Sequence, residues 1–151
     1  MKILVIQTAF IGDVILATAL LEKLHRRLPH ARIDVVVRKG NEALFSGHPY
    51  VQKVHVWNKK QDKTLNLLKL GIRLRRERYD WVINLQRFFS TGLLTLMSLA
   101  PNRAGFYKNP LSGWFTHPAP HRIGTPEAPV HEVERNCLLA DPLAGPGVFR
   151  P

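Results

Sequence analysis

Ile3-Leu4-Val5-Ile6-Gln7, a short and almost entirely apolar run, opens the chain and decides its fold. A strand this apolar must be covered on both faces, which is typical of a parallel sheet. Residues 13–28 follow with helical periodicity, and Pro29 ends the helix. The apolar positions of this helix are Val14, Ala17, Leu21, Leu24 and Leu28, whereas Glu22, Lys23, Arg26 and Arg27 form its polar side.

The alternation of strand and helix continues along the chain. The pattern predicts strands at 33–37, 51–57, 81–85 and 104–107, and helices at 64–78, 93–100 and 131–139. Residues 51–57 alternate apolar and polar side chains, which favours a place near the edge of the sheet. Residues 108–129 are rich in proline and are expected to form an irregular loop. With right-handed crossovers, these elements predict an α/β fold built as a Rossmann-like, three-layer parallel sheet.

Length and tail composition indicate one folded unit. A chain of 151 residues corresponds to a single domain with one core. We expect this domain to cover residues 1–140. Residues 141–151 carry the proline and glycine pattern of a tail or of the start of an interdomain linker.

Charge is the unusual feature of the composition. The chain has 22 Lys and Arg against 11 Asp and Glu, so its formal net charge is +11. This excess indicates an anionic partner: nucleic acid, a phosphorylated small molecule or an anionic membrane surface. Eight of the basic side chains lie in residues 59–78, which form either a solvated helix face or a surface attracted to anionic lipid. Trp57 beside them is expected in the core rather than at an interface.

The sequence excludes several classes of site. Cys137 is the single cysteine, which excludes an intrachain disulfide framework and a cysteine-based zinc site and favours a reducing, cytoplasmic compartment. Asp13 interrupts the apolar start, which argues against a signal peptide, and no apolar run is long enough to cross a membrane. The histidines lack metal-ligand spacing, so no metal site is predicted. No serine lies in a G-x-S-x-G motif, so a hydrolase triad is unsupported.

We expect functional residues in the loop that follows the opening strand, because ligands of such sheets bind beyond the carboxyl ends of the strands. Residues 8–13 contain neither the dinucleotide-binding G-x-G-x-x-G nor a P-loop. They end in Gly12-Asp13 at the start of the first helix. Asp13 is either a helix cap or first-turn carboxylate, or a general base at the mouth of a site. Gly12 lets a substrate approach the backbone closely.

Four segments in this order resemble glycosyltransferase family 9, the bacterial heptosyltransferases that build the inner core of lipopolysaccharide. The first is the opening strand with Gly12-Asp13-Val14-Ile15. The others are Arg78-Tyr79-Asp80-Trp81-Val82-Ile83-Asn84-Leu85-Gln86, Arg103-Ala104-Gly105-Phe106 and His131-Glu132-Val133-Glu134-Arg135-Asn136. Together these segments extend over nearly the whole chain.

The resemblance implies the amino-terminal domain of a GT-B enzyme, whose two Rossmann-like halves face a cleft. The amino half receives the acceptor and the carboxyl half holds the ADP-heptose donor. We therefore expect the donor-binding domain to be absent and the isolated chain to be nearly inactive. The family inverts the anomeric configuration and needs no metal or other cofactor, and its proposed catalytic base falls on Asp13. The expected acceptor-binding residues are Thr8, Gly12, Lys59, Lys60, Lys63, Gln86 and Arg87.

Two positions depart from the family pattern. Asn84 stands where an aspartate is usual, so no carboxylate role is carried over to it. Arg87 stands where a glycine is common. It either contacts a carboxylate or phosphate of the acceptor, as suits a glycolipid that carries acidic or phosphorylated sugars, or is a solvated loop charge.

The expected partner is an anionic glycolipid, a lipopolysaccharide precursor. The chain would meet it in the cytoplasm, through peripheral contact with the inner face of the inner membrane. Two alternatives remain: a non-catalytic remnant, and a basic module that binds an anionic partner such as nucleic acid. No specific nucleic acid is expected, because the sequence contains no known nucleic-acid-binding motif.

Overall fold

The structure, a computed structural model, describes residues 1–120 and 132–147. Its elements in chain order are β1 (Lys2–Ile6), α1 (Ile11–Arg27), β2 (Arg32–Arg38), η1 (Glu42–Phe45), β3 (Val51–Trp57), α2 (Lys63–Glu77), β4 (Trp81–Asn84), α3 (Phe89–Met97), β5 (Asn102–Phe106), η2 (Ser112–Trp114), β6 (His117–Ala119), α4 (Glu132–Leu138) and α5 (Asp141–Ala144). Within the described residues, no helix has both the length and the apolar character needed to cross a membrane.

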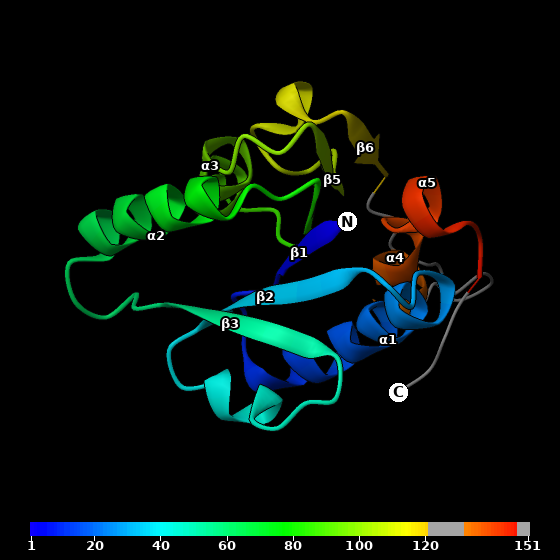
Figure 1. Ribbon diagram of the computed structural model, residues 1–151. Helices are drawn as coiled ribbons and strands as arrows, with labels where there is room; N and C mark the ends of the chain where they lie inside the picture. The colour runs from blue at the N-terminus through cyan, green and yellow to red at the C-terminus, as the bar shows by residue number, and fades with distance from the viewer. Residues whose placement is uncertain (121–131, 148–151) are drawn as a thin grey trace, which may run out of the picture.

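The six strands form one parallel sheet in the order β3-β2-β1-β4-β5-β6 (Figure 1). β1 lies at its centre, where Val5 pairs with Val35 of β2 on one side and Ile83 of β4 on the other. β3 occupies one edge, as its alternating sequence predicts. The predicted α/β fold with a parallel sheet is confirmed.

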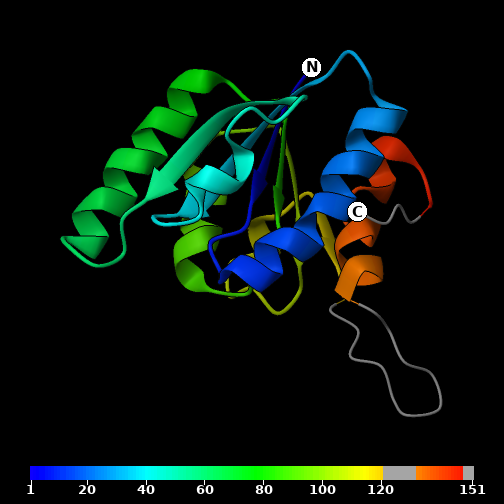
Figure 2. The ribbon, with the colours of Figure 1, turned by 90° about the horizontal axis from the view of Figure 1, so that it is seen from below.

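Alternate residues of β1 enter two different cores. Ile3 and Val5 pack in the cluster that α1 covers, whereas Leu4 and Ile6 pack with α2 and α3 on the opposite face. Figure 2 shows the sheet between these two helical layers. Trp57 lies in the second cluster with an exposed fraction of 2%, so its predicted place in the core is confirmed. The double coverage explains why the central strand is apolar at consecutive positions.

Two elements differ from the sequence expectation. α3 begins at Phe89 rather than at residue 93. Gly92 in its first turns approaches Asn109 so closely that a Cβ atom there would overlap the side-chain oxygen of Asn109. Residues 117–119, expected within an irregular loop, form the edge strand β6 beside β5. An edge position tolerates Pro118, which has no N–H to donate to a neighbour. Residues 121–131, which include His131, lie outside the described residues.

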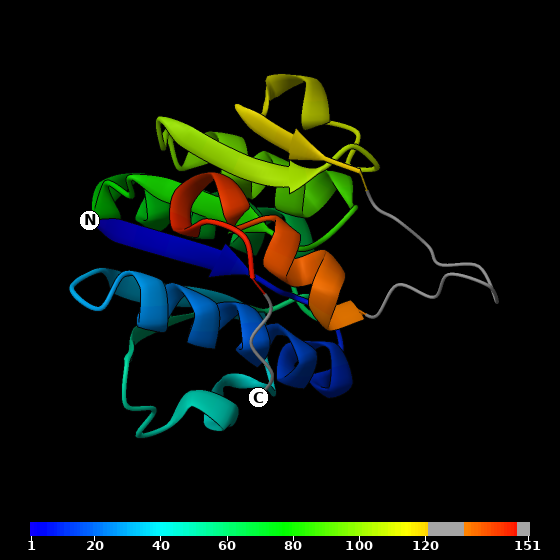
Figure 3. The same cartoon turned by 90° about the vertical axis from the view of Figure 1, so that its right-hand side faces the viewer.

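Lys23, predicted on the polar side of the first helix, is instead fully buried. The reason is that α4 and α5 lie beside α1 on the same face of the sheet and pack against it (Figure 3). The ammonium group of Lys23 donates to the carbonyl of Cys137 at 2.9 Å and to a carboxylate oxygen of Asp141 at 2.5 Å. Residues 141–144, assigned above to a linker or tail, therefore form a helical turn bound to the domain.

A buried polar network joins the strands at their amino-terminal ends. The carboxylate of Asp34 is fully buried and accepts hydrogen bonds from the Tyr79 hydroxyl at 2.6 Å and from the Arg32 guanidinium at 3.2 Å. The Tyr79 hydroxyl also lies 2.8 Å from Nε2 of His55. Burial lowers the pKa of His55 and raises the pKa of Tyr79, which keeps both side chains neutral. The network fixes β2, β3 and the segment that precedes β4 relative to one another.

Glu77 closes this network at the end of α2 and gives the fold an acid-sensitive point. Its carboxylate meets Lys53 at 2.5 Å, Lys2 at 3.1 Å and Arg32 at 3.4 Å. Hydrogen bonds from Lys53 and then Lys2 lower the pKa of Glu77 from 4.5 to about 2. The unfolded chain therefore binds more protons between these two values, so this contribution to stability is present above pH 4.5 and is lost as the pH falls toward 2.

We predict that Glu77→Gln lowers the free energy of unfolding at neutral pH and flattens its decline with acid. Urea unfolding of both proteins at about pH 7 and about pH 3 measures this, and the difference between them should shrink at the lower pH. Asp62→Asn, at an exposed position, serves as the control. An equal stability loss for Glu77→Gln at both pH values would contradict the prediction.

We predict that Lys23→Met loosens α4 and α5 from α1, because it removes two hydrogen bonds from a buried cation. The expected loss is about 1–3 kcal/mol of local stability. Amide hydrogen exchange in residues 132–144 should accelerate, while exchange in β1 should change little. Arg26→Met, a matched change at an exposed position of the same helix, should leave exchange in α4 unaltered. Unchanged protection of α4 and α5 in Lys23→Met would refute the proposed tie.

Candidate active site at the carboxyl ends of the strands

A hollow of about 460 Å³ lies where the central strands end. Because all strands are parallel, the loops that follow β1, β3 and β4 leave the same edge of the sheet. The hollow is lined by Thr8, Ala9, Phe10, Asp13, Arg38, Lys59, Leu85, Gln86, Arg87, Phe88 and Arg135. Its volume lies in the usual range for small-molecule sites.

Asp13 lies in the first turn of α1 and faces this hollow. The residue that caps the helix is Phe10, which makes no side-chain cap hydrogen bond, and the backbone N–H of Asp13 donates to the Phe10 carbonyl at 3.0 Å. Within the described residues, no hydrogen bond or ion pair engages the Asp13 carboxylate. The side chain is therefore a half-buried first-turn carboxylate that remains available to a ligand.

Cationic side chains surround the aspartate. The ammonium group of Lys59 donates to the Thr8 carbonyl at 2.7 Å, which holds it over the end of β1. The Arg38 guanidinium lies 4.9 Å from the centre of the Phe10 ring. Burial lowers the pKa of Lys59, and the nearby charges of Arg38 and Lys63 lower it further. An anionic ligand would relieve this repulsion, so the electrostatics favour binding of a phosphate or carboxylate.

Buried amides hold the loop that carries Arg87. The amide nitrogen of Asn109 donates to the carbonyls of Gln86 at 3.1 Å and Phe88 at 3.0 Å, one on each side of Arg87. Asn84 accepts from the backbone N–H of Gln86 at 2.8 Å, and the Gln86 amide donates to Gln7 of β1. The side chain of Arg87 is thus exposed on a fixed backbone.

Two buried polar atoms at this edge lack a partner within the described residues. They are the hydroxyl oxygen of Thr8, whose residue is 1% exposed, and the side-chain nitrogen of Asn84, which is fully buried. Unsatisfied buried polar atoms are uncommon in folded proteins, and Thr8 lines the hollow. A ligand or water hydrogen bond to Thr8 would satisfy its hydroxyl.

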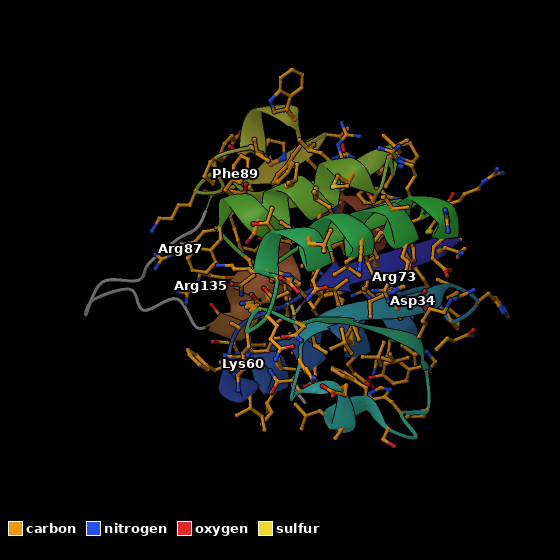
Figure 4. All side chains as sticks on the ribbon, turned by 90° about the vertical axis from the view of Figure 1, so that its left-hand side faces the viewer. Asp34, Lys60, Arg73, Arg87, Phe89 and Arg135 are labelled. Carbon is orange, nitrogen blue, oxygen red and sulfur yellow. The ribbon has the colours of Figure 1, made fainter. Side chains whose placement is uncertain are left out.

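The structure brings together most of the site residues named from the sequence. Asp13, Thr8, Lys59, Gln86 and Arg87 line the one hollow. Figure 4 shows Lys60, Arg87 and Arg135 toward one end of the molecule and Asp34 toward the other.

Three of the named residues lie outside the hollow. Gly12 adjoins it with open space around the position of a Cβ atom. Lys60 lines a separate depression with Lys39 and Gln61. Lys63 begins α2 with its ammonium group 5.9 Å from the centre of the Trp57 ring.

Sequence reasoning missed Arg38 and Arg135 as site residues. Arg38 is the last residue of β2, and only the strand order places that end beside β1. Arg135 arrives from α4, far along the chain, because α4 packs on α1. The signal in the sequence that could have indicated Arg135 is its position in the fourth family segment, residues 131–136. Among residues 1–120 and 132–147, no group of three or more His, Cys, Asp or Glu could hold a metal ion.

Comparison with known proteins identifies the family. Residues 67–147 match the family model for glycosyltransferase family 9 (heptosyltransferase). Lipopolysaccharide heptosyltransferase 3 of Escherichia coli K12 is 32% identical over 141 residues, which cover 87% of this chain and 39% of that protein.

Solved structures agree with this match. The structure of E. coli ADP-heptose lipopolysaccharide heptosyltransferase II has a TM-score of 0.75 and 31% identity, and the match covers 93% of this chain and 40% of that one. A family 9 glycosyltransferase from Veillonella parvula, at 22% identity, has the same fold with a TM-score of 0.83, over 96% of this chain and 42% of that one.

The chain thus spans about two fifths of the length of these relatives. They do not favour the nucleic-acid-binding alternative. The family model covers more than half of the chain, and the solved relatives superimpose on its sheet and helices. The chain belongs to glycosyltransferase family 9, the heptosyltransferase family.

Proposed function

We propose that this chain forms the acceptor-binding side of an inverting heptosyltransferase that acts on the lipopolysaccharide inner core. The observation that carries the proposal is a carboxylate without a partner in the described residues, Asp13, facing a hollow lined by Arg38, Lys59, Arg87 and Arg135. A base needs an accessible carboxylate, and an acceptor that carries phosphates or carboxylates needs cations around it.

In the proposed reaction, Asp13 takes the proton of an acceptor hydroxyl. The hydroxyl oxygen forms a bond to the anomeric carbon of the heptose, while the bond from that carbon to the phosphate oxygen of ADP breaks. ADP leaves from the opposite face with the electron pair, so the configuration at the anomeric carbon inverts. Arg38, Lys59 and Arg87 would orient the acceptor through its anionic groups.

The relatives support both substrates of this proposal. The similar proteins are described as lipopolysaccharide heptosyltransferases, and one of them as an ADP-heptose enzyme. Because those proteins are more than twice as long as the matched segment, we assign the acceptor side to this chain and place the donor in the family's second half. The acceptor is then an anionic glycolipid, which the chain would meet in the cytoplasm at the surface of the inner membrane.

Asp13→Asn tests the proposed base. Heptose transfer from ADP-heptose, assayed with this chain joined to the donor-binding half of a family member, should fall by roughly 10²–10⁴-fold, because the amide cannot take the proton. Binding of the acceptor by the chain should persist within a few fold. Retained transfer would reduce Asp13 to a first-turn carboxylate.

Arg38→Gln and Arg87→Gln test the cationic hollow. Each should weaken binding of a deacylated, phosphorylated inner-core oligosaccharide by roughly tenfold or more, because each removes a charge-assisted hydrogen bond. Isothermal titration calorimetry at two salt concentrations measures the effect, and a deacylated probe excludes any contribution from a membrane. Arg26→Gln, which removes a charge at the far end of α1, should bind normally. Equal affinity in all variants would contradict the proposed acceptor site.

A further inference from the structure

The outer face of α2 combines apolar exposure with positive charge. Leu65, Leu68 and Ile72 are 50%, 42% and 46% exposed. Their spacing places them on one side of the helix, opposite the residues that enter the core. The buried side consists of Leu67, Leu70, Gly71 and Leu74. We call Leu65, Leu68 and Ile72 the outer stripe.

Basic side chains flank the outer stripe. Lys69, Arg73 and Arg76 are exposed along one side of it, and Arg75 lies on the other with its guanidinium donating to the Met97 carbonyl at 3.3 Å. The one acidic residue within α2, Glu77, is turned toward Lys2, Lys53 and Arg32. The outer face is therefore cationic around an apolar centre, which is the pattern of a helix that lies in a lipid interface.

The chemistry of this face distinguishes between three occupants. Nucleic acid would match the charge but offers no apolar layer to cover three aliphatic side chains. A second copy of the chain would match the stripe but would bring two basic faces together, which costs electrostatic energy. A bilayer that contains anionic lipids offers both an apolar layer and negative headgroups.

We propose that α2 is the membrane-docking surface of this protein, with the outer stripe inserted between acyl chains and its basic flank on anionic headgroups. The inference stands on the helix alone and does not depend on the catalytic role of Asp13. Docking through α2 adds an apolar contact with the acyl chains to the electrostatic attraction that is expected from the net charge.

The position of α2 suits a lipid-linked acceptor. The helix begins at Lys63, whose carbonyl accepts a hydrogen bond from the Trp57 indole at 3.3 Å. Lys59, 5.0 Å from the centre of the same indole, lines the hollow that holds Asp13. In Figure 4, α2 crosses the front of the molecule, and Lys60 and Arg87 lie toward one end of it. Docking through α2 would therefore hold the cationic hollow next to the headgroup layer.

Vesicle flotation with the chain itself tests the proposal. The probes are vesicles of phosphatidylethanolamine with phosphatidylglycerol, and vesicles of phosphatidylcholine alone. Leu68→Gln with Ile72→Gln removes most of the apolar contact and keeps good helix formers at exposed positions. The matched control is Leu44→Gln with Ile15→Gln, because these residues are 40% and 49% exposed in η1 and α1, whose core packs on the other face of the sheet. Lys69→Gln with Arg76→Gln tests the charge.

We expect the chain to bind the anionic vesicles and not the phosphatidylcholine vesicles. The stripe variant and the charge variant should each lose roughly tenfold or more in partition coefficient, while the control binds like the unchanged chain. All variants should show the same circular dichroism and unfolding midpoint.

Three results would overturn the proposal. Full binding by the stripe variant would show that electrostatic attraction, without any apolar insertion, holds the chain on the vesicle. Absence of binding to anionic vesicles by the unchanged chain would remove the membrane as the occupant. A dimer that the stripe variant converts to a monomer would make this face a contact between copies. Since the deacylated acceptor and the transfer assay involve no membrane, failure here leaves the proposed transfer reaction and acceptor site intact, and failure of those assays leaves the docking surface intact.

Discussion

The parallel pairing of β1 between β2 and β4 is the constraint on which the rest of this structure depends. It requires helices on both faces of the sheet, which α1 provides on one side and α2 and α3 on the other. It also places the loop that follows each strand at the same edge of the sheet. Residues as distant in sequence as Asp13 and Arg87 therefore line one hollow.

Most residues of the family segments serve the scaffold rather than the ligand. Arg103 donates to the carbonyls of Ala100 and Trp114 at 2.7 and 2.8 Å, and Gly105 leaves room for the Phe115 ring, because a Cβ atom there would overlap it. Tyr79 fixes Asp34 at the amino-terminal edge. Only the ends of the segments reach the hollow. The family segments thus consist largely of residues that stabilise the sheet. These residues position the few side chains that line the hollow.

The sequence predicts what is local and periodic. Apolar runs and helical spacing located β1 to β5, α1 and α2 to within a few residues, and the first loop pointed to Asp13. What it missed depends on contacts between distant segments. Lys23 looks solvated until α4 and α5 cover it, β6 contains a proline and has little apolar signal, and Arg38 becomes a site residue only through the strand order. No periodicity within one element encodes such contacts.

The net positive charge is unevenly distributed, and its distribution carries more information than its sum. At the amino-terminal edge, Glu77 meets three cations and Asp34 meets Arg32, so the charges there are largely compensated. At the carboxyl edge, no ion pair joins Arg38, Lys59 or Arg87 to a carboxylate within residues 1–120 and 132–147. Burial lowers the pKa of Lys59, and the nearby charges of Arg38 and Lys63 lower it further, so the cations at this edge repel one another. A fold that can neutralise its charges at one edge but not at the other presents the second edge to an anionic ligand.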